Sequence, residues 1–544
     1  WSLSSSYNYQ HYKKGYKLSI HGKNFIGNEL SAKGDKSSKI YDINSGEALN
    51  GDFYHATSDE VDSALSLANN AFLVYKQVSQ NKRADFLDTI AEEIMNLGDE
   101  LVVRTMSESN LPRPRIEGER GRTVGQLKMF ATLLRDGSWV EASIDTALPD
   151  RQPLPRNDLR KMLRPLGVVS VFEASNFPLA FSCAGGDTAS ALAAGCPVIV
   201  KAHSSHSGTS ELVASAIIKA VKKCDMPNGT FSMVHGGGRT VGQQIVMDEV
   251  VKAVGFTGST QGGMNLFDIA NKRKTPIPVF AEMGSINPCL FLPSALNDTK
   301  KLAASYAFSI TLGAGQFCTN PGLILAIKSE KLEAFKKDLA QEITGTKPAV
   351  MLSKGIQEAY ETNKDAAIKQ HGISIIAESL EKNSISEGKP VVASVDAIEF
   401  IKNNKLQEEV FGPYSLLVEC EDAKQLDEVV ACLEGQLTAT VMGDEEEIAQ
   451  YSDLVYSLEN KCGRLLFNSV PTGVEVCHSM QHGGPFPAAT DSRFTSVGSG
   501  AIKRFVRPVC FQDCPSSILP DELKDANPLN IQRLLNSEYT KSAV

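Results

Sequence analysis

The second quarter of the sequence alternates between short apolar runs and stretches with helical spacing, and this alternation limits the possible folds more than any other feature. Residues 168–172 read VVSVF, and further short apolar runs lie at 198–200, 231–234 and 253–256. Residues 211–221 repeat apolar side chains at helical intervals. Strands that alternate with helices form parallel sheets that are covered on both faces. The sequence therefore predicts an α/β fold with a ligand site at the carboxyl ends of the strands.

The length of the chain adds a second constraint. A chain of 544 residues is too long for one core, because single cores stop growing at about 250–300 residues. Two large domains are therefore expected. Residues 60–97 have helical spacing, a second α/β block is expected from about 286 to 477, and the Pro- and Gly-rich segment 471–487 is expected to be a loop.

Charge and composition argue against several classes of protein. The net charge of -9 is spread along the chain without a basic block, which argues against a nucleic-acid partner. No apolar run reaches the roughly 20 residues of a membrane span. The cysteines include one C-x3-C pair, Cys510 and Cys514, but no second pair accompanies it, so no metal site is expected. An odd number of cysteines in a long chain fits a reducing compartment.

One cysteine differs from the others in its surroundings. Cys318 lies in the heptapeptide GQFCTNP, whose glycine and polar residues argue against a buried strand. A cysteine nucleophile needs a lowered pKa or a nearby base, and a cysteine in apolar surroundings is usually inert. Upstream lie Glu282 in the segment FAEMG and the turn formed by Gly258 and Ser259. Glycines and a helix N-terminus let the backbone approach a pyrophosphate, although the turn lacks G-x-G-x-x-G spacing and alone could be a structural connection. A thiol, a carboxylate and such a loop are the parts needed to oxidise an aldehyde through a thioester.

With these motifs in this order, the chain resembles the aldehyde dehydrogenase superfamily over about residues 19–512. It looks most like the NADP-dependent branch that includes bacterial fatty aldehyde dehydrogenase and 2,5-dioxovalerate (α-ketoglutaric semialdehyde) dehydrogenase. The resemblance implies an α/β fold with a Rossmann-like cofactor domain, an α/β catalytic domain and a small β oligomerisation element. The expected boundaries are 19–146 and 163–284 for the cofactor domain, 285–478 for the catalytic domain, and 147–162 and 479–512 for the oligomerisation element. Residues 1–18 are expected to be a disordered or artificially added N-terminal extension. Residues 513–544 are expected to be a C-terminal extension without a role in the family pattern.

The resemblance implies roles for the reacting groups. Cys318 is the expected nucleophile, and Asn176 with the backbone N–H of Cys318 is expected to stabilise the oxyanion, although an asparagine before Phe-Pro could also be a turn former. Glu282 is the expected base for thioester hydrolysis, with a pKa raised by burial. Of two neighbouring histidines, His478 is the candidate to activate the thiol or to share deacylation, whereas His482 is expected to bond the loop backbone.

The implied cofactor is NADP, with NAD less preferred. Lys201 matches a lysine that contacts the adenosine ribose, although it could be a solvated lysine at a strand end. Ser204 stands where NAD-preferring relatives carry a glutamate that would repel a 2′-phosphate, and a hydroxyl can donate to that phosphate. Arg239 matches an arginine that binds the 2′-phosphate. The other implied contacts are Gly258, Ser259 and Gly263 at the pyrophosphate, and Glu409 and Phe411 at the nicotinamide ribose and ring.

The implied substrate is 2,5-dioxopentanoate, oxidised to 2-oxoglutarate, because the segment 112–123 resembles the 2,5-dioxovalerate dehydrogenases. Arg122 is the candidate to bind the substrate carboxylate, whereas the alternating charges of this segment could equally form a solvated helix face. A medium- or long-chain fatty aldehyde is the alternative substrate. A catalytically silent structural protein and an acylating enzyme that uses coenzyme A are further alternatives, but the retained thiol and carboxylate favour an enzyme of the EC 1.2.1 class.

The expected partners are a small-molecule aldehyde and further copies of the chain, as a homodimer or homotetramer. No nucleic acid or membrane partner is expected. The expected compartment is the cytoplasm, or the mitochondrial matrix for a eukaryotic chain.

Overall fold

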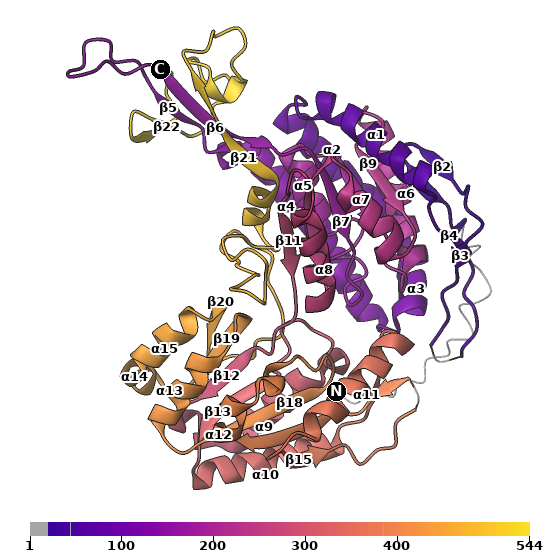
Figure 1. Ribbon diagram of the computed structural model, residues 1–544, viewed down its shortest axis with the longest axis vertical. Coiled ribbons are helices and arrows are strands. Elements are labelled where there is room, and N and C mark those ends of the chain that lie inside the picture. Colours follow the sequence, from indigo (N-terminus) through magenta and orange to yellow (C-terminus); the bar gives the residue numbers. More distant parts are fainter. Residues whose placement is uncertain (1–19, 44, 385) are drawn as a thin grey trace.

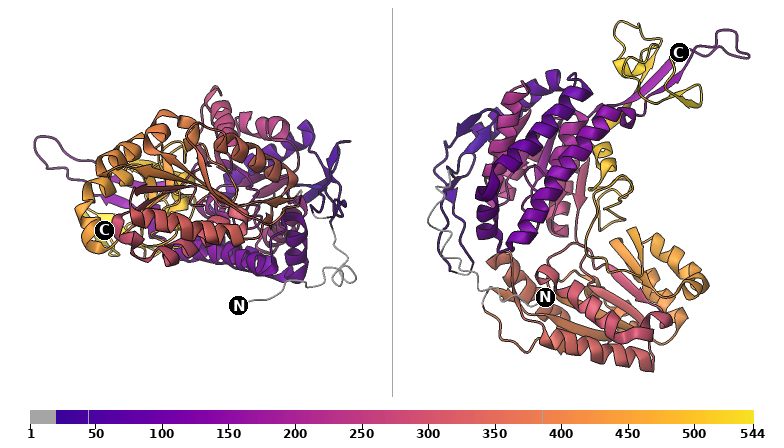
Figure 2. Two further views of the ribbon diagram at one scale, coloured as in Figure 1. Left: turned by 90° about the horizontal axis from the view of Figure 1, so that it is seen from below. Right: turned by 180° about the vertical axis from the view of Figure 1, so that it is seen from behind.

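The computed structural model describes residues 20–43, 45–384 and 386–544, which form two α/β lobes and a narrower β-sheet arm (Figure 1). Figure 2 shows that the arm extends away from both lobes. The expected N-terminal extension, residues 1–18, lies outside the described residues. Among the described residues, no helix combines the length and hydrophobicity needed to cross a bilayer.

The first lobe is built on a sheet with the strand order β11-β10-β7-β8-β9-β1-β2. The strands from β11 to β9 are parallel, and β1 and β2 add an antiparallel edge. All four predicted apolar runs are strands of this sheet, so the predicted parallel sheet is confirmed. The bounds are β1 Asn24–Ile26, β2 Glu29–Ser31, β7 Val168–Phe172, β8 Val198–Lys201, β9 Phe231–Val234, β10 Val251–Thr257 and β11 Val279–Glu282.

Helices cover both faces of this sheet, because its strands carry apolar side chains on both sides. Val169 and Val171 point to one core, which they share with helices α2 to α6. Val168 and Phe172 point to the other core, with α1, α7 and α8. The bounds are α1 Ser58–Tyr75, α2 Gln80–Asn96, α3 Gly98–Ser109, α4 Arg113–Asp136, α5 Gly186–Ala194, α6 Ser207–Lys223, α7 Gln243–Met247 and α8 Thr260–Asn271.

The predicted helical stretch 60–97 is confirmed as helical but forms two helices. Thr57 caps α1 through a capping box with Glu60, and Ser79 accepts a hydrogen bond from the backbone of Lys82 at the start of α2. The second cap begins a new helix, so the apolar spacing on either side of it belongs to separate helices.

The second lobe is built on a sheet with the order β15-β17-β18-β13-β12-β19-β20, in which only the β15–β17 pairing is antiparallel among the described residues. It lies within residues 286–477, where a second α/β block was expected. Phe291 packs with α9 and α10, whereas Leu325 packs with α11, α12, α13 and α15 on the other face. The bounds are β12 Pro288–Phe291, β13 Leu323–Ile327, β15 Ser374–Glu378, β17 Val391–Asp396, β18 Tyr414–Cys420, β19 Gln436–Met442, β20 Cys462–Phe467, α9 Thr299–Thr311, α10 Glu330–Gly345, α11 Lys354–Ile368, α12 Ala397–Lys402, α13 Ala423–Cys432, α14 Glu445–Gln450 and α15 Ser452–Glu459.

The arm is a sheet with the order β21-β6-β5-β22-β23. The C-terminal segment 513–544 supplies β22 and β23 and buries Leu523 and Ile531 in the core of the first lobe. This segment, to which the family resemblance gave no role, thus contributes to the arm and to the core of the first lobe. The bounds are β5 Ser143–Asp145, β6 Leu159–Pro165, β21 Val506–Gln512, β22 Arg533–Leu535 and β23 Glu538–Thr540. Two separate pairs of short strands complete the described strands: β3 Ser37–Ser38 with β4 Phe53–Tyr54, and β14 Ala349–Val350 with β16 Glu387–Gly388.

Candidate active site

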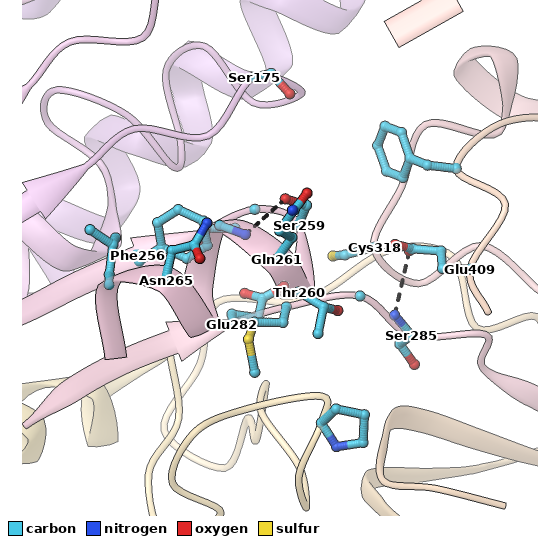
Figure 3. Close-up of a pocket in the computed structure, with 18 of the residues that line it drawn as sticks. Ser175, Phe256, Ser259, Thr260, Gln261, Asn265, Glu282, Ser285, Cys318 and Glu409 are labelled. Carbon is cyan, nitrogen blue, oxygen red and sulfur yellow. Dashed lines mark hydrogen bonds between the residues drawn. The ribbon is translucent and has the colours of Figure 1, made fainter. Parts of the chain in front are cut away.

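A cavity of about 1660 Å³ lies between the two lobes, at the carboxyl ends of the strands of the first sheet (Figure 3). Lys201, Thr257 and Glu282, which end β8, β10 and β11, line it from the first lobe. Cys318 and Glu409 line it from the second lobe. The parallel sheet thus places its ligand site at the predicted edge, and the second lobe brings a thiol to that edge.

Cys318 lies in a tight turn between α9 and β13. Gly315 has a φ of 65°, and a Cβ there would lie 2.2 Å from the carbonyl oxygen of Gly412. Only glycine allows this close approach of the two backbones. Asn287 donates a hydrogen bond of 2.9 Å from Nδ2 to the carbonyl oxygen of Cys318. These contacts hold the half-buried thiol at the wall of the cavity.

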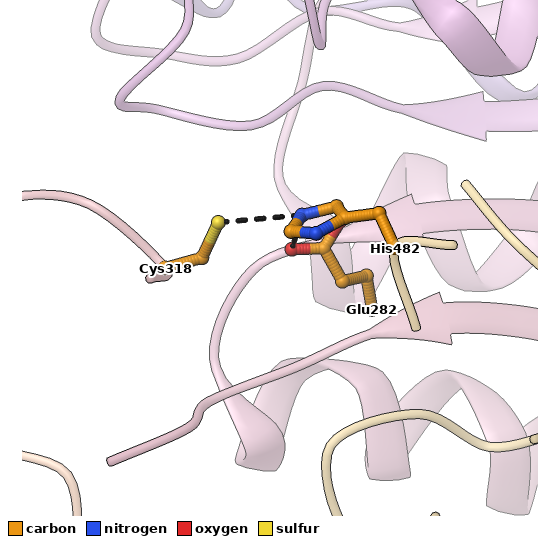
Figure 4. Close-up of side chains that lie close together, drawn as sticks. All are labelled: Glu282, Cys318 and His482. Carbon is orange, nitrogen blue, oxygen red and sulfur yellow. Dashed lines mark hydrogen bonds and ion pairs between the residues drawn. The ribbon is translucent and has the colours of Figure 1, made fainter. Parts of the chain in front are cut away.

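Three side chains from distant parts of the sequence meet at this wall (Figure 4). Sγ of Cys318 lies 3.5 Å from Nε2 of His482, at hydrogen-bonding geometry. The same Nε2 lies 3.0 Å from Oε1 of Glu282. Both His482 and Glu282 are almost fully buried, and Oε2 of the glutamate accepts a hydrogen bond of 2.9 Å from Ser496. The thiol and the carboxylate therefore both face Nε2 of the same imidazole, whose Nδ1 has no hydrogen-bond partner among the described residues.

The histidine beside the thiol is not the one that the sequence favoured. His478 is exposed, and its Nδ1 is 2.9 Å from Oγ of Ser499. The choice of His478 over His482 is therefore wrong. Residues far from the local pattern hold His482 in place, because its backbone N–H donates to Oγ1 of Thr495 and its carbonyl accepts from the N–H of Ser496.

A local signal for His482 does exist in the two glycines that follow it. A Cβ on Gly484 would lie 2.2 Å from the carbonyl oxygen of Gln436, and a Cβ on Gly483 would lie 2.8 Å from that of Phe494. Only glycine allows the backbone to approach its neighbours this closely. Two glycines after a histidine therefore indicate that its loop is packed against the protein rather than exposed to solvent.

The electrostatics of this group decide which side chain can act as a base. Burial raises the pKa of Cys318 well above its ordinary value, and the neighbouring Glu282 carboxylate adds to the rise. Burial alone would also raise the pKa of Glu282, but the interactions of its carboxylate with His482 and Ser496 outweigh this effect and lower that pKa. The predicted rise in the pKa of Glu282 is therefore wrong. The thiol is therefore neutral near pH 7, and it needs a proton acceptor before it can act as a nucleophile.

Asn176 and the backbone of Cys318 offer donors for an oxyanion. Nδ2 of Asn176 donates to the carbonyl oxygen of Gln316 at 3.1 Å, and an amide nitrogen carries a second hydrogen. The backbone N–H of Cys318 donates to no acceptor within residues 20–43, 45–384 and 386–544. Asn176 and Cys318 both line the cavity.

The N-terminus of α8 faces the cavity and suits a pyrophosphate. Gly258, Ser259 and Thr260 line the cavity, and Oγ of Ser259 accepts the N–H of Gly262 as the helix cap. Gly263, a predicted contact, is buried behind this turn, where a Cβ would lie 2.6 Å from the sulfur of Met283. Its role is to let the helix pack closely on β11, rather than to contact a ligand.

The part of the cavity next to the end of β8 carries a lysine and a buried carboxylate that the sequence did not indicate. Lys201 lines the cavity, and burial lowers its pKa although Glu173 opposes this effect. Oε2 of Glu173 accepts the N–H of His203 at 2.7 Å, whereas its Oε1 is buried without a hydrogen-bond partner among the described residues. His203 lines the cavity, while Ser204 is exposed outside the lining. Sequence reasoning missed Glu173 and His203 because neither belongs to a motif that it used.

The remaining predicted cofactor residues also lie at the cavity. Arg239 is exposed in its lining and forms no ion pair within the described part of the chain. Glu409 accepts the N–H of Ser285 at 3.4 Å, and burial raises its pKa to about 7. Phe411 lines the cavity near it. A helix N-terminus, two cations and a carboxylate over one cavity fit a phosphorylated dinucleotide with free ribose hydroxyls.

Arg122 lies on α4 and packs against two aromatic residues that line the cavity. Its guanidinium is over the rings of Phe181 and Phe177, at 5.3 and 5.7 Å from their centroids. Nε and Nη2 are buried without hydrogen-bond partners among the described residues. Burial lowers the pKa of Arg122, and Glu119 and Cys318 partly offset this shift. The arginine is therefore no part of a solvated helix face, and its two free donors lie beside the rings of Phe177 and Phe181, which line the cavity.

A second arginine near the thiol was missed by sequence reasoning. Arg464 on β20 donates to the carbonyl oxygens of Pro471 and Gly473, each at 3.0 Å, while its Nε is buried without a partner among the described residues. Burial lowers its pKa, and Cys318 opposes that shift. No local pattern distinguishes this arginine from other strand residues.

Comparisons with known proteins agree with this geometry. Residues 32–485 match the family model described as "Aldehyde dehydrogenase family". An alpha-ketoglutaric semialdehyde dehydrogenase of Acinetobacter baylyi is 49% identical over 492 residues, which cover 90% of this chain and 93% of that protein. Alpha-ketoglutaric semialdehyde dehydrogenase 2 of Azospirillum brasilense is 48% identical over 519 residues, or 95% of this chain and 99% of that protein.

Solved structures show the same fold. The betaine aldehyde dehydrogenase of Staphylococcus aureus in complex with NAD+ superposes with a TM-score of 0.78 at 19% identity, over 91% of this chain and 95% of that chain. A 1-pyrroline-5-carboxylate dehydrogenase superposes with a TM-score of 0.76 at 18% identity, over 91% of this chain and 93% of that chain. The predicted aldehyde dehydrogenase fold is confirmed.

Proposed function

The chain belongs to the aldehyde dehydrogenase family, and we propose that it oxidises 2,5-dioxopentanoate to 2-oxoglutarate with NADP and with Cys318 as the nucleophile. Family membership makes the chain an oxidoreductase of the EC 1.2.1 class. The observation that carries the proposal is the contact of the Cys318 thiol with His482 and Glu282 at a cavity large enough for a dinucleotide. A silent structural protein would not need to keep this group.

The acylation step follows from the contacts of Cys318. His482 accepts the thiol proton across the 3.5 Å contact while the sulfur attacks the aldehyde carbon. The carbonyl oxygen becomes an oxyanion, which Asn176 and the Cys318 N–H stabilise; one such donor is typically worth ~2.7–4 kcal/mol. NADP, when bound, supplies the hydride acceptor, and the acyl group remains on the sulfur as a thioester.

Hydrolysis of the thioester requires an activated water. Glu282 has a lowered pKa and is ionised at neutral pH, so it can accept the proton of a water beside the thioester. His482 bridges this carboxylate and the sulfur, so it can return a proton to the leaving thiolate. Coenzyme A would be needless for this release, which argues against the acylating alternative.

The preference for NADP rests on charge at the adenosine end of the cavity. Lys201 and Arg239 line it, and the exposed arginine has no ion-pair partner among the described residues. The unpaired Oε1 of Glu173 can accept a ribose hydroxyl. Ser204 lies outside the lining, so we give the 2′-phosphate contact to Arg239 and not to this serine.

The substrate proposal rests on Arg122. The guanidinium of Arg122 has two free donors that suit the carboxylate of an α-keto acid. It lies over the rings of Phe177 and Phe181, which line the cavity and keep it partly out of water. The two relatives at 49% and 48% identity carry the name alpha-ketoglutaric semialdehyde dehydrogenase, which agrees with this chemistry. A fatty aldehyde would leave the guanidinium unpaired, which makes the fatty-aldehyde alternative less favourable.

The test is kcat/KM for 2,5-dioxopentanoate against hexanal and benzaldehyde, with wild type and Arg122→Ala. A hydrogen bond to a charged group contributes about 1.5–3 kcal/mol, so the variant should lose about 10- to 160-fold on the dioxo acid and nothing on hexanal. Lys128→Ala, an exposed change on the same helix, is the control. Equal losses on all aldehydes, or a wild-type preference for hexanal, would refute the substrate assignment.

Assembly and compartment are also proposals. The arm carries exposed apolar side chains, Leu148 and Leu154 among them, which suits a homodimer or homotetramer. All cysteines of the described chain are free, which agrees with a reducing compartment such as the cytoplasm.

A further inference from the structure

We propose that Cys318, His482 and Glu282 together form a binding site for Zn²⁺ that reversibly blocks the enzyme. The metal is a ligand of the resting protein and takes no part in aldehyde oxidation. Its binding depends only on the three side chains, whereas the resulting inhibition rests on the proposed role of Cys318 as the nucleophile.

The spacing of the donor atoms matches zinc coordination. Zn–S bonds of about 2.3 Å and Zn–N bonds of about 2.0–2.1 Å at a tetrahedral angle separate sulfur and nitrogen by about 3.5–3.6 Å. Sγ of Cys318 and Nε2 of His482 are 3.5 Å apart. Nitrogen and oxygen ligands of zinc are separated by about 3.3–3.4 Å, and Nε2 lies 3.0 Å from Oε1 of Glu282. All three ligand atoms lie within 4.8 Å of one another, so modest rotations of the thiol and carboxylate complete the set.

The chemistry of the donors also favours zinc. Thiolate, imidazole and carboxylate are the three ligand types that zinc uses, and three protein ligands leave one position for water. Oε1 of Glu282 is buried without a hydrogen-bond donor at good geometry among the described residues, so it faces the site unsatisfied. A thiolate and a carboxylate together neutralise the charge of the metal in this buried place. Binding releases the thiol proton to solvent, uses the lone pair of Nε2 of His482 while Nδ1 carries the imidazole proton, and changes no oxidation state.

The site is specific within the described part of the chain. No other group of three histidine, cysteine, aspartate or glutamate side chains there brings its ligand atoms this close together. In a zinc-bound thiolate the sulfur lone pair coordinates the metal, so the sulfur cannot attack a carbonyl. The inhibition should therefore compete with the aldehyde and be reversed by a chelator.

The binding test uses Co²⁺ as a spectroscopic substitute for zinc with the reduced, coenzyme-free protein. Wild type should bind one Co²⁺ per chain with a thiolate-to-cobalt absorption band, and added Zn²⁺ should remove that band. Cys318→Ser should abolish the band, and His482→Gln should weaken binding about 100-fold or more, because each of three ligands carries a large share of the affinity. Cys510→Ser, which removes an exposed thiol, and His478→Ala should leave both band and affinity unchanged.

Two outcomes would overturn the site: a cobalt–thiolate band that survives in Cys318→Ser, or one that is lost in Cys510→Ser. Circular dichroism of each variant checks that it folds. The inhibition is measured separately, as the effect of Zn²⁺ and then a chelator on aldehyde oxidation. A protein that binds cobalt through Cys318 but oxidises no aldehyde would refute the proposed function and leave the metal site standing. An active enzyme that shows no cobalt band and whose rate is insensitive to zinc would refute the metal site and leave the proposed function standing.

Discussion

Replacing His482 by glutamine is the sharpest test of how the thiol is activated. Glutamine keeps a polar side chain of similar reach but cannot accept a proton near pH 7. Burial raises the pKa of Cys318 well above its ordinary value, so without a base almost none of the thiol is ionised at neutral pH. Nε2 of His482 is a proton acceptor that lies 3.5 Å from Sγ at hydrogen-bonding geometry.

The size of the effect follows from this geometry. A positioned general base typically contributes about 10²–10⁴-fold, which corresponds to about 2.7–5.4 kcal/mol of transition-state stabilisation. His482→Gln should lower kcat/KM by that factor at pH 7. The loss should shrink as the pH rises, because the buried thiol then ionises without help. His478→Ala, which changes an exposed histidine four residues away, should have no effect.

The assay is the rate of iodoacetamide alkylation of Cys318, followed by mass spectrometry of the peptide that contains it. This rate reports how readily the thiol gives up its proton during attack on the reagent, and it needs neither coenzyme nor aldehyde. Wild type should alkylate readily at pH 7, and His482→Gln should reach a similar rate only at alkaline pH. Equal alkylation rates at pH 7 in both proteins, or an equal loss in His478→Ala, would refute the role given to His482.

Two further predictions concern the coenzyme. Arg239→Ala should raise the KM for NADP by about 10- to 160-fold, which is the range expected for the loss of a charged hydrogen bond. The KM for NAD should stay unchanged. A parallel rise of the KM for both coenzymes would contradict the 2′-phosphate contact. The pKa of Glu409 is raised to about 7, so below that pH it is protonated and a weaker acceptor for ribose hydroxyls. NADP binding, measured by fluorescence titration, should therefore weaken as the pH falls through about 7, and Glu409→Gln should remove this step.

Much of the fold could be predicted from local pattern. Short apolar runs such as 231–234 became strands with the predicted limits, because a parallel strand buried on both faces needs apolar side chains throughout. The C-terminal strands could not be predicted in this way. Segment 513–544 is mostly polar, and only a few separated side chains such as Leu523 and Ile531 anchor it to the first lobe.

A site residue could be predicted where its own short segment forms a recognisable motif. Cys318 and Glu282 each lie in a distinctive motif, and both line the cavity. The histidine was missed because its contact with the thiol spans 164 residues of sequence, and no spacing rule reaches that far. The direction of the Glu282 pKa was missed for the same reason, since burial alone argues for a rise and only the unseen partner His482 reverses it.

The most direct test of the thioester is mass spectrometry of Glu282→Gln after mixing with NADP and 2,5-dioxopentanoate. The variant keeps the nucleophile and His482 but lacks the carboxylate that activates water. It should release about one NADPH per active site in a burst, as expected for an acyl-enzyme that accumulates, and then turn over about 10²–10⁴-fold more slowly than wild type. The acyl group should be found on the peptide of Cys318. NADPH formation without an adduct on that peptide, or an adduct on another residue, would contradict the account.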